Sequence, residues 1–180
     1  MAAIWTRDTP WRQGHVLTTD AIQALGLSHP ETPDSTCVVV ISHDCDLAND
    51  ALQIEPDVEV IVGCHLPKGD GNYFWAKAPR TLHIDVLQND IAAVVELVAT
   101  AKLFIPKQAL AAFFPDTAYS FPGKSLSALR SWLGIRYNRA AFGSLLPESE
   151  RMNVSLKGSF MVTKEIELFA DLMYSENKSY

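Results

Sequence analysis

Short apolar runs separated by turn-forming residues fill the first two thirds of the chain, a pattern typical of β-structure. Residues 37–41 (C-V-V-V-I) are apolar at every position, which predicts a central strand covered on both faces. Residues 57–62 begin by alternating acids with valine, which predicts a strand with one face in water. Further strands are expected at residues 14–17, 81–86, 94–98 and 102–105.

Turn and helix signals divide the remaining segments. Residues 68–72 predict a turn, and a strand that begins at residues 73–75 would complete a hairpin. A brief helix with a threonine cap is expected at residues 19–25, before Gly26. After Pro106 the spacing of apolar residues becomes helical and predicts helices at residues 107–114, from a Ser125 cap to about residue 138, and at 165–174.

These elements predict a fold of the α+β class, with one domain over residues 1–180. A small, strongly bent antiparallel sheet or barrel would occupy residues 11–105, followed by C-terminal helices in residues 106–180. A chain of 180 residues is long enough to bury a core without disulfides or a structural metal.

Composition narrows the classes of function. The chain is 48% hydrophobic and 20% charged, values of a folded protein, and its net charge of −6 does not favour nucleic acid or an anionic membrane. Cys37, Cys45 and Cys64 cannot all pair with one another, and the N-terminus lacks the apolar run of an export signal. We expect free thiols in a reducing cytoplasm and no membrane span.

Charge is unevenly distributed along the chain. Residues 13–67 contain nine acids and no lysine or arginine, whereas residues 117–147 contain four basic residues and no acid. Two interpretations stay open. The two segments pack against each other with paired charges, or the basic segment forms a local anion site on an acidic protein.

A polar pentad directly follows the apolar strand at residues 37–41. It consists of Ser42, His43, Asp44, Cys45 and Asp46. Polar groups at the end of a buried strand are a common place for a site. If the strand continues, His43 and Cys45 share one face and the other three share the opposite face. Cys45 beside an imidazole is a candidate nucleophile, and His43 oriented by an aspartate is a candidate general base. The structural alternative is a strand end whose aspartates close a turn.

Metal binding has little support. The chain has no C-x-x-C and no H-E-x-x-H, so zinc is not expected. Catalysis by the pentad requires no cofactor. The alternative is a mechanism that uses a Mg²⁺ ion held by Asp44 and Asp46.

Two other segments carry candidate site residues. In strand geometry Arg80 and Leu82 lie on one face and His83 on the other, so Arg80 is a candidate anion clamp and His83 a candidate acid. The alternative for Arg80 is an ion pair with Asp57 or Glu59.

The late helix carries the third group of candidates. Arg136 falls inside the apolar stripe of this helix, where a charged group must be paired or lie in a cleft. We predict that Arg136 projects toward the pentad and pairs with Asp44 or Asp46. Tyr137 and Arg139 are further candidates for substrate binding.

Four runs, at residues 11–17 (W-R-Q-G-H-V-L), 37–47 (C-V-V-V-I-S-H-D-C-D-L), 78–84 (A-P-R-T-L-H-I) and 132–142 (W-L-G-I-R-Y-N-R-A-A-F), resemble an uncharacterised group of bacterial and phage-associated proteins. The S-x-D-C-D-L and R-Y-x-R-x-A-F motifs carry most of this likeness. More distantly, the glycine before the first strand and the V-V-V-I-S strand are similar to the small barrel of MazF/PemK-type toxins, which are ribonucleases. Those toxins are shorter and lack the arginine-bearing helix, so no catalytic role is transferred.

The first functional prediction is a nuclease-like enzyme acting on a phosphodiester or other anionic substrate, with Arg80, Arg136 and Arg139 neutralising charge, His43 as base and His83 as acid. The alternatives are a non-catalytic acidic binding or inhibitor protein in phage–host conflict, and a sensor of a small anionic ligand. A nucleic-acid or protein partner and a homodimer fit these predictions.

Overall fold

The computed structural model describes residues 4–137, 149–161 and 167–179, and its contacts divide the chain into two compact units, residues 1–138 and 139–180. The described part of the first unit contains α1 (Thr19–Ala24), the 3-10 turn η1 (Pro33–Ser35), β1 (Thr36–Val40), α2 (Asp44–Leu47), β2 (Asp57–Leu66), β3 (Thr81–Gln88), β4 (Ile91–Val98), β5 (Lys102–Pro106), α3 (Lys107–Leu110), β6 (Tyr119–Ser120) and α4 (Gly123–Tyr137). The second unit contains β7 (Ser149–Met161) and β8 (Glu167–Ser179).

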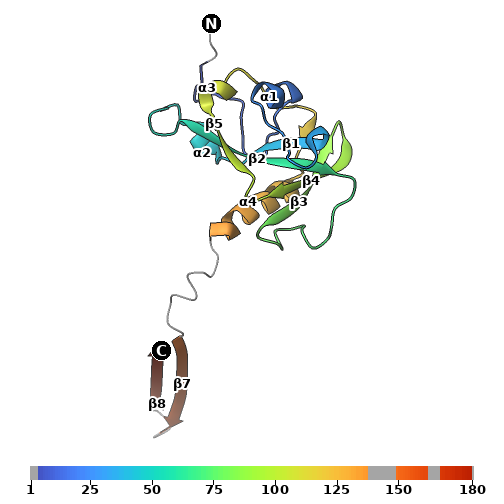
Figure 1. Ribbon diagram of the computed structural model, residues 1–180. Helices are drawn as coiled ribbons and strands as arrows, with labels where there is room; N and C mark the ends of the chain where they lie inside the picture. Colours follow the sequence, from blue (N-terminus) through green and yellow to red (C-terminus); the bar gives the residue numbers. More distant parts are fainter. Residues whose placement is uncertain (1–3, 138–148, 162–166, 180) are drawn as a thin grey trace. The chain divides into compact units, whose positions relative to one another are not determined.

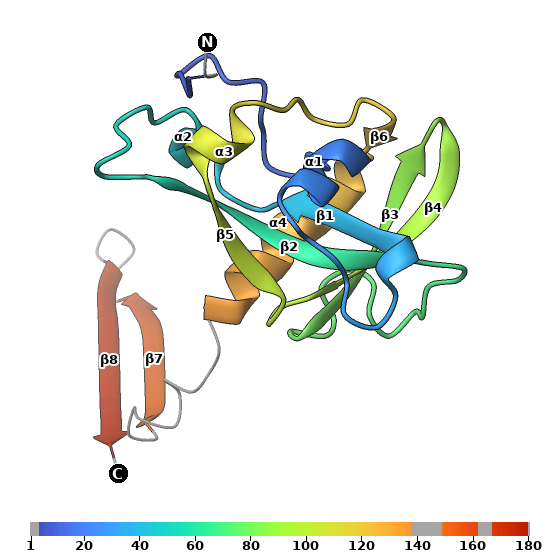
Figure 2. The same cartoon turned by 45° about the horizontal axis from the view of Figure 1, so that its top comes forward.

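The first unit is built on one antiparallel sheet in the order β1-β2-β4-β3-β6, with β5 paired to the N-terminal part of β2. The sheet curls strongly into a half-barrel, and α4 follows the strands and lies along it (Figures 1 and 2). This arrangement confirms the predicted α+β class with a bent antiparallel sheet and a helix after it. Of the helical C-terminal part, α3 and α4 are present as helices.

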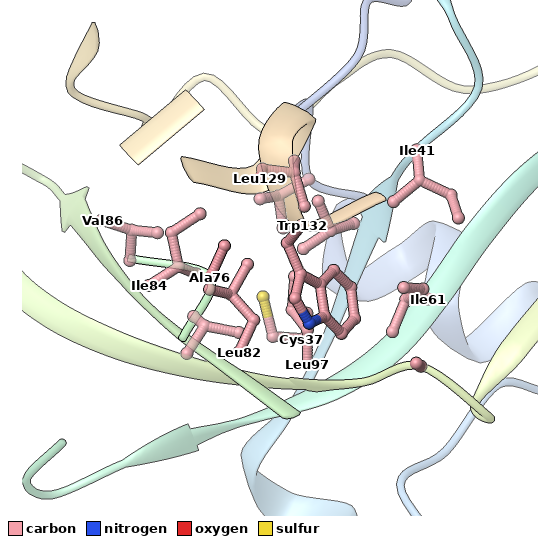
Figure 3. Close-up of a cluster of buried hydrophobic side chains, with 14 residues drawn as sticks. Cys37, Ile41, Ile61, Ala76, Leu82, Ile84, Val86, Leu97, Leu129 and Trp132 are labelled. Carbon is pink, nitrogen blue, oxygen red and sulfur yellow. The ribbon is translucent and has the colours of Figure 1, made fainter. Parts of the chain in front are cut away.

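Two buried clusters on opposite faces of the sheet explain the all-apolar run at residues 37–41. Cys37, Val39 and Ile41 pack in the cluster that contains Leu129 and Trp132 of α4 (Figure 3). Val38 and Val40 pack in the other cluster, which includes Trp5, Trp11 and residues of α1 and α3. Successive strand residues point to opposite faces, so a strand covered on both sides must be apolar throughout, as predicted.

The segment before α1 covers the remaining edge of β1. The backbone N–H groups of Gly14 and Leu17 donate to Val40 and Val38, and the Val40 N–H donates to His15. This pairing gives β1 a neighbour on each side, since β2 pairs with its other edge. The strand expected at residues 14–17 is thus reduced to isolated bridges.

Several predicted elements differ from the structure. Residues 73–75 are not a strand: Trp75 and Ala76 have φ angles of 60° and 58°, which a strand excludes. The Tyr73 carbonyl instead accepts a hydrogen bond from the His83 N–H, so this segment covers β3. The helix predicted at residues 107–114 is confirmed only for its first turn, α3.

The helix predicted at residues 165–174 is wrong, because the described part of this segment belongs to β8. In the β7–β8 hairpin, Val154 pairs with Tyr174, Leu156 with Leu172 and Phe160 with Leu168. Apolar residues at i, i+4 and i+6 of β8 suit a strand as well as a helix. The partner strand β7, which the sequence pattern did not identify, decided between the two.

Candidate active-site cleft

A cleft of about 460 Å³ opens where the C-terminal half of α4 passes β2, β5 and the segment after β1. Ile41, Leu133 and Phe104 supply apolar wall. Its titratable and charged lining residues are His43, Asp46, Glu55, Glu59, Lys102 and Arg130. The polar pentad therefore contributes directly to a concave surface, as expected for groups at the end of a buried strand.

The pentad forms a helical turn and does not continue the strand. His43 is the N-cap of α2, with φ −67° and ψ 150°, and its backbone carbonyl accepts from the N–H groups of Asp46 and Leu47. The strand does not continue, so the alternation of side chains expected in that case does not apply. The turn forms because the His43 ring caps the free Cys45 N–H, which satisfies a donor that a helix start leaves open.

His43 and Cys45 form a close pair at the exposed surface. The Nδ1 atom of His43 lies 2.9 Å from the Cys45 Sγ atom and accepts a longer hydrogen bond, 3.4 Å, from the Cys45 N–H. Sγ also lies 3.6 Å from Oδ1 of Asp46. Because Nδ1 accepts, the neutral ring carries its proton on Nε2, so the lone pair of His43 faces the thiol.

Ser42 holds the strand end in place. Its side chain is buried, and its Oγ atom accepts a hydrogen bond of 2.7 Å from the Glu59 N–H. The Glu59 carbonyl in turn accepts from the N–H groups of Ile41 and Ser42. These contacts give Ser42 a structural role between β1 and β2. Ser42 also lines the cleft, and its role in substrate binding stays a prediction.

Asp44 is held by Gln13 and by the late helix. One Asp44 carboxylate oxygen accepts 2.8 Å from the Gln13 N–H, and the other lies 3.7 Å from Arg130 of α4. Arg130 Nε also donates 3.0 Å to the Gln13 side chain, whose amide nitrogen donates 2.9 Å to the Ile41 carbonyl. Gln13 thus connects the N-terminal segment, the strand end and α4. No sequence pattern pointed to Gln13, since an isolated glutamine belongs to no motif.

A guanidinium from the late helix therefore does meet a pentad carboxylate, but the described contact comes from Arg130 and was predicted for Arg136. Arg136 and Tyr137 belong to α4, but their side chains lie outside the described residues, as does Arg139 entirely. Their predicted roles stay predictions.

A buried lysine, which the sequence analysis also missed, fixes the far end of α2. Lys107 is fully buried, and its Nζ atom donates 2.6 Å to the Asp46 carbonyl and 2.9 Å to the Asn49 carbonyl. The Trp5 indole N–H donates to the Leu47 carbonyl. Burial lowers the pKa of Lys107, while nearby carboxylates, Glu55 first among them, oppose this shift. These donors satisfy the open carbonyls at the end of the α2 turn.

The cations of the cleft are partly neutralised within it. Lys102 of β5 pairs with Glu59 of β2 at 2.7 Å. Glu59, one of the two partners considered for Arg80, thus pairs with Lys102 in the described structure. Arg80 is exposed and is not among the residues that line the cleft.

His83 lies at the other end of the sheet from His43. Cross-strand pairing aligns His83 with Glu96, Glu96 with Cys64, and Cys64 with Thr36 at the start of β1. β1 extends about 13 Å from Thr36 to its other end, and His43 follows that other end. Both His83 nitrogens are also engaged, by the Asp70 N–H at 2.8 Å and by Glu96 at 2.9 Å. The structure does not bring His83 to the predicted acid position.

The described residues contain no group of three or more His, Cys, Asp or Glu side chains placed to hold a metal ion. Asp46 lines the cleft, whereas Asp44 lines a neighbouring groove and is held by Gln13 and Arg130. The two carboxylates thus do not line the same cavity, which does not fit the Mg²⁺ alternative.

No helix in the described ranges has the length and apolarity to cross a membrane. Comparison of the chain with protein-family models, with curated proteins and with solved structures finds no match. The resemblances drawn from the four sequence runs, the nucleic-acid or protein partner and the homodimer therefore stay predictions.

Proposed function

We propose that the cleft and its rim form the active site of a hydrolase acting on a phosphodiester or another anionic ester, with Cys45 as nucleophile and His43 as its base. His43 lines the cleft, and Cys45 is exposed beside His43 and is not itself a lining residue. The observation that carries this proposal is the 2.9 Å approach of His43 Nδ1 to Cys45 Sγ beside a concave surface. A thiol paired with an imidazole acceptor is a recurring nucleophile in enzymes.

The reaction follows from the position of the lone pair. Nδ1 takes the thiol proton, and the thiolate attacks the phosphorus or carbonyl carbon of the substrate. The ester oxygen leaves with the proton from the imidazolium. Water then cleaves the bond to sulfur and restores the thiol. His43 serves this step better than direct activation of water, because its Nδ1 already faces sulfur and its Nε2 carries the proton.

Arg130 is the cation best placed for the charge of an anionic substrate. It lines the cleft, its side chain is 53% exposed, and its position is fixed by Gln13 and Asp44. A guanidinium held in place stabilises charge that develops in a transition state. Lys102 contributes less, because Glu59 already neutralises it.

The test is cleavage of labelled RNA, labelled DNA and a chromogenic phosphodiester, each with and without Mg²⁺. We expect turnover without added metal, and losses of about a hundredfold or more in Cys45→Ser and His43→Ala. Arg130→Gln should lose activity, whereas Arg80→Gln, a matched arginine outside the cleft, should retain it. Full activity in Cys45→Ser would overturn the thiol mechanism, and loss in His43→Ala alone would then assign His43 as the sole base.

One observation favours a second function, a non-catalytic protein that binds a basic partner. Carboxylates outnumber cations in the cleft: Asp46, Glu55 and Glu59 lie with Lys102 and Arg130. The excess of carboxylates would attract a positively charged ligand to the cleft. In that case Glu55→Gln should weaken binding, and His43→Ala and Cys45→Ser should leave it unchanged.

A further inference from the structure

A second concave surface lies beside the cleft and shares two residues with it. This groove has a volume of about 290 Å³ and is formed by residues 12–15, the segment around β6, and α4. Gln13 and Arg130 line both the groove and the cleft. The charged groups of the groove are Arg12, Arg130 and Asp44, so guanidiniums outnumber carboxylates here, the reverse of the cleft.

Arg12 is held at the groove by its own backbone. Its NH1 group donates 2.7 Å to the Thr9 carbonyl and 2.6 Å to the Trp11 carbonyl. These two bonds use both hydrogens of that nitrogen. Among the described residues no hydrogen bond or ion pair engages Nε or NH2. A guanidinium that is already fixed loses little entropy when it binds an anion.

His15 lines the groove, and its ring carries a hydrogen-bond donor. Its Nδ1 accepts 3.1 Å from the Arg12 N–H, so the neutral ring carries its proton on Nε2. Burial and the charge of Arg12 lower the pKa of His15, and Asp44 opposes that shift. The turn that brings Arg12 and His15 together needs Gly14, whose φ is +90° and whose missing Cβ would lie 2.9 Å from Leu126.

Asp44 does not cancel the positive character of the groove. One of its oxygens accepts from the Gln13 N–H and the other lies near Arg130. Arg130 donates through Nε to Gln13 and keeps further N–H groups for a ligand, because a guanidinium has five. Two fixed guanidiniums, the His15 Nε2–H and the exposed Ser120 therefore border one hollow.

We propose that this groove binds the phosphate group of a ligand. Phosphate accepts several hydrogen bonds in the forked geometry that arginine supplies. The proposal goes beyond the hydrolase assigned to the cleft, since phosphate binds here whether or not Cys45 reacts. The phosphate can belong to a free small molecule or to a nucleic-acid chain, and the experiment separates these sources.

The test follows the ring signals of His15 and His29 by NMR at pH 7 during titration with inorganic phosphate, adenosine monophosphate and a short single-stranded RNA. Ionic strength is held constant with chloride. The His15 signals should shift to saturation while those of His29, a half-buried histidine outside the groove, stay in place. The tightest of the three probes identifies the source of the phosphate. Equal shifts of both histidines, or shifts that chloride reproduces, would overturn the proposal.

Variants separate specific binding from a general charge effect. Arg12→Gln and Arg130→Gln should each weaken phosphate binding about tenfold or more. Arg80→Gln removes the same charge outside the groove and should leave affinity unchanged. Because Arg12 also braces the N-terminal segment, Ser120→Asp supplies a second variant: it adds a negative charge at the exposed rim and should abolish binding. Equal weakening in the Arg12 and Arg80 variants would refute the site.

Proton linkage gives an independent readout of the same site. A bound anion favours the charged imidazole, so the pKa of His15 should rise when phosphate saturates the groove. An unchanged pKa of His15 would contradict the placement of phosphate beside it. All of these measurements are repeated on Cys45→Ser, so failure of the catalytic proposal and failure of the groove proposal are distinguishable.

Discussion

The clearest quantitative prediction concerns Lys107, the buried lysine that holds α2. The substitution Lys107→Met keeps the length of the side chain and removes its charge and its donors. The carbonyls of Asp46 and Asn49, which are half-buried residues, then lose the donor that Lys107 supplies. The Asp46 carbonyl keeps the Asn49 N–H as a donor. The contact of the Lys107 ammonium with the Trp5 ring, 5.8 Å from its centre, is lost as well.

The expected change in the free energy of unfolding comes from two opposing terms. Loss of the donor to the Asn49 carbonyl costs about 1–3 kcal/mol, and loss of the charged hydrogen bond to the Asp46 carbonyl costs about 1.5–3 kcal/mol. Removal of the ammonium also removes the cost of burying a charge, which offsets part of that loss. The same burial lowers the pKa of Lys107. We expect a net loss of about 2–4 kcal/mol.

Urea denaturation at pH 7, followed by tryptophan fluorescence, measures this loss. Lys77→Met is the matched control, because Lys77 also donates to a backbone carbonyl, that of Gly71, but at the exposed surface. The control should change stability by less than about 0.5 kcal/mol. If the two variants lose the same amount, or if Lys107→Met is stabilised, the two hydrogen bonds of Lys107 do not contribute as reasoned here.

Three further predictions follow from burial. Cys45 is exposed and Cys37 and Cys64 are buried, so Ellman's reagent should modify Cys45 alone in the native state and all three after unfolding. Burial raises the pKa of Cys37 to about 12 and that of Tyr119 to about 12, so the native state keeps both protons longer than the unfolded chain. Stability should fall as the pH rises above 9, and less steeply in Cys37→Ala, as urea midpoints between pH 8 and 11 would record. Trp132 is buried in the α4 interface, and Trp132→Ala should cost about 3–5 kcal/mol in urea unfolding, with Trp132→Phe costing less.

The strands were the most predictable part of the fold. The run at residues 37–41 can satisfy every apolar side chain only when both faces are covered, and β1 lies between two clusters for that reason. The segment at residues 73–75 has strand-like residues, but Trp75 has a positive φ angle and the Tyr73 carbonyl accepts from the distant His83 N–H. Local composition does not report such a long-range bond.

The candidate site was predictable in location and not in geometry. The pentad after a buried strand marked the place where a cleft exists. Its conformation depends on a ring nitrogen capping a backbone N–H and on the donors Trp5 and Lys107. Arg136 was favoured for the contact with Asp44 because it lies in the apolar stripe of the helix. Contacts with Asp44 depend on where α4 crosses the pentad, and that crossing places Arg130 beside it.

The sequence by itself determined the class of the fold, the buried strand and the polar segment that follows it, because burial and periodicity act on neighbouring residues. Only the tertiary structure decided which groups from distant segments meet. Gln13 hydrogen-bonds to both Arg130 and the strand end at Ile41, and Lys107 donates to a carbonyl of α2. His83 pairs with Glu96 on a different part of the sheet. Hydrogen bonds of about 3 Å depend on the crossing of whole elements. Arg130 and Arg136 lie about 1.7 helical turns apart on α4, so the crossing decides which arginine reaches Asp44.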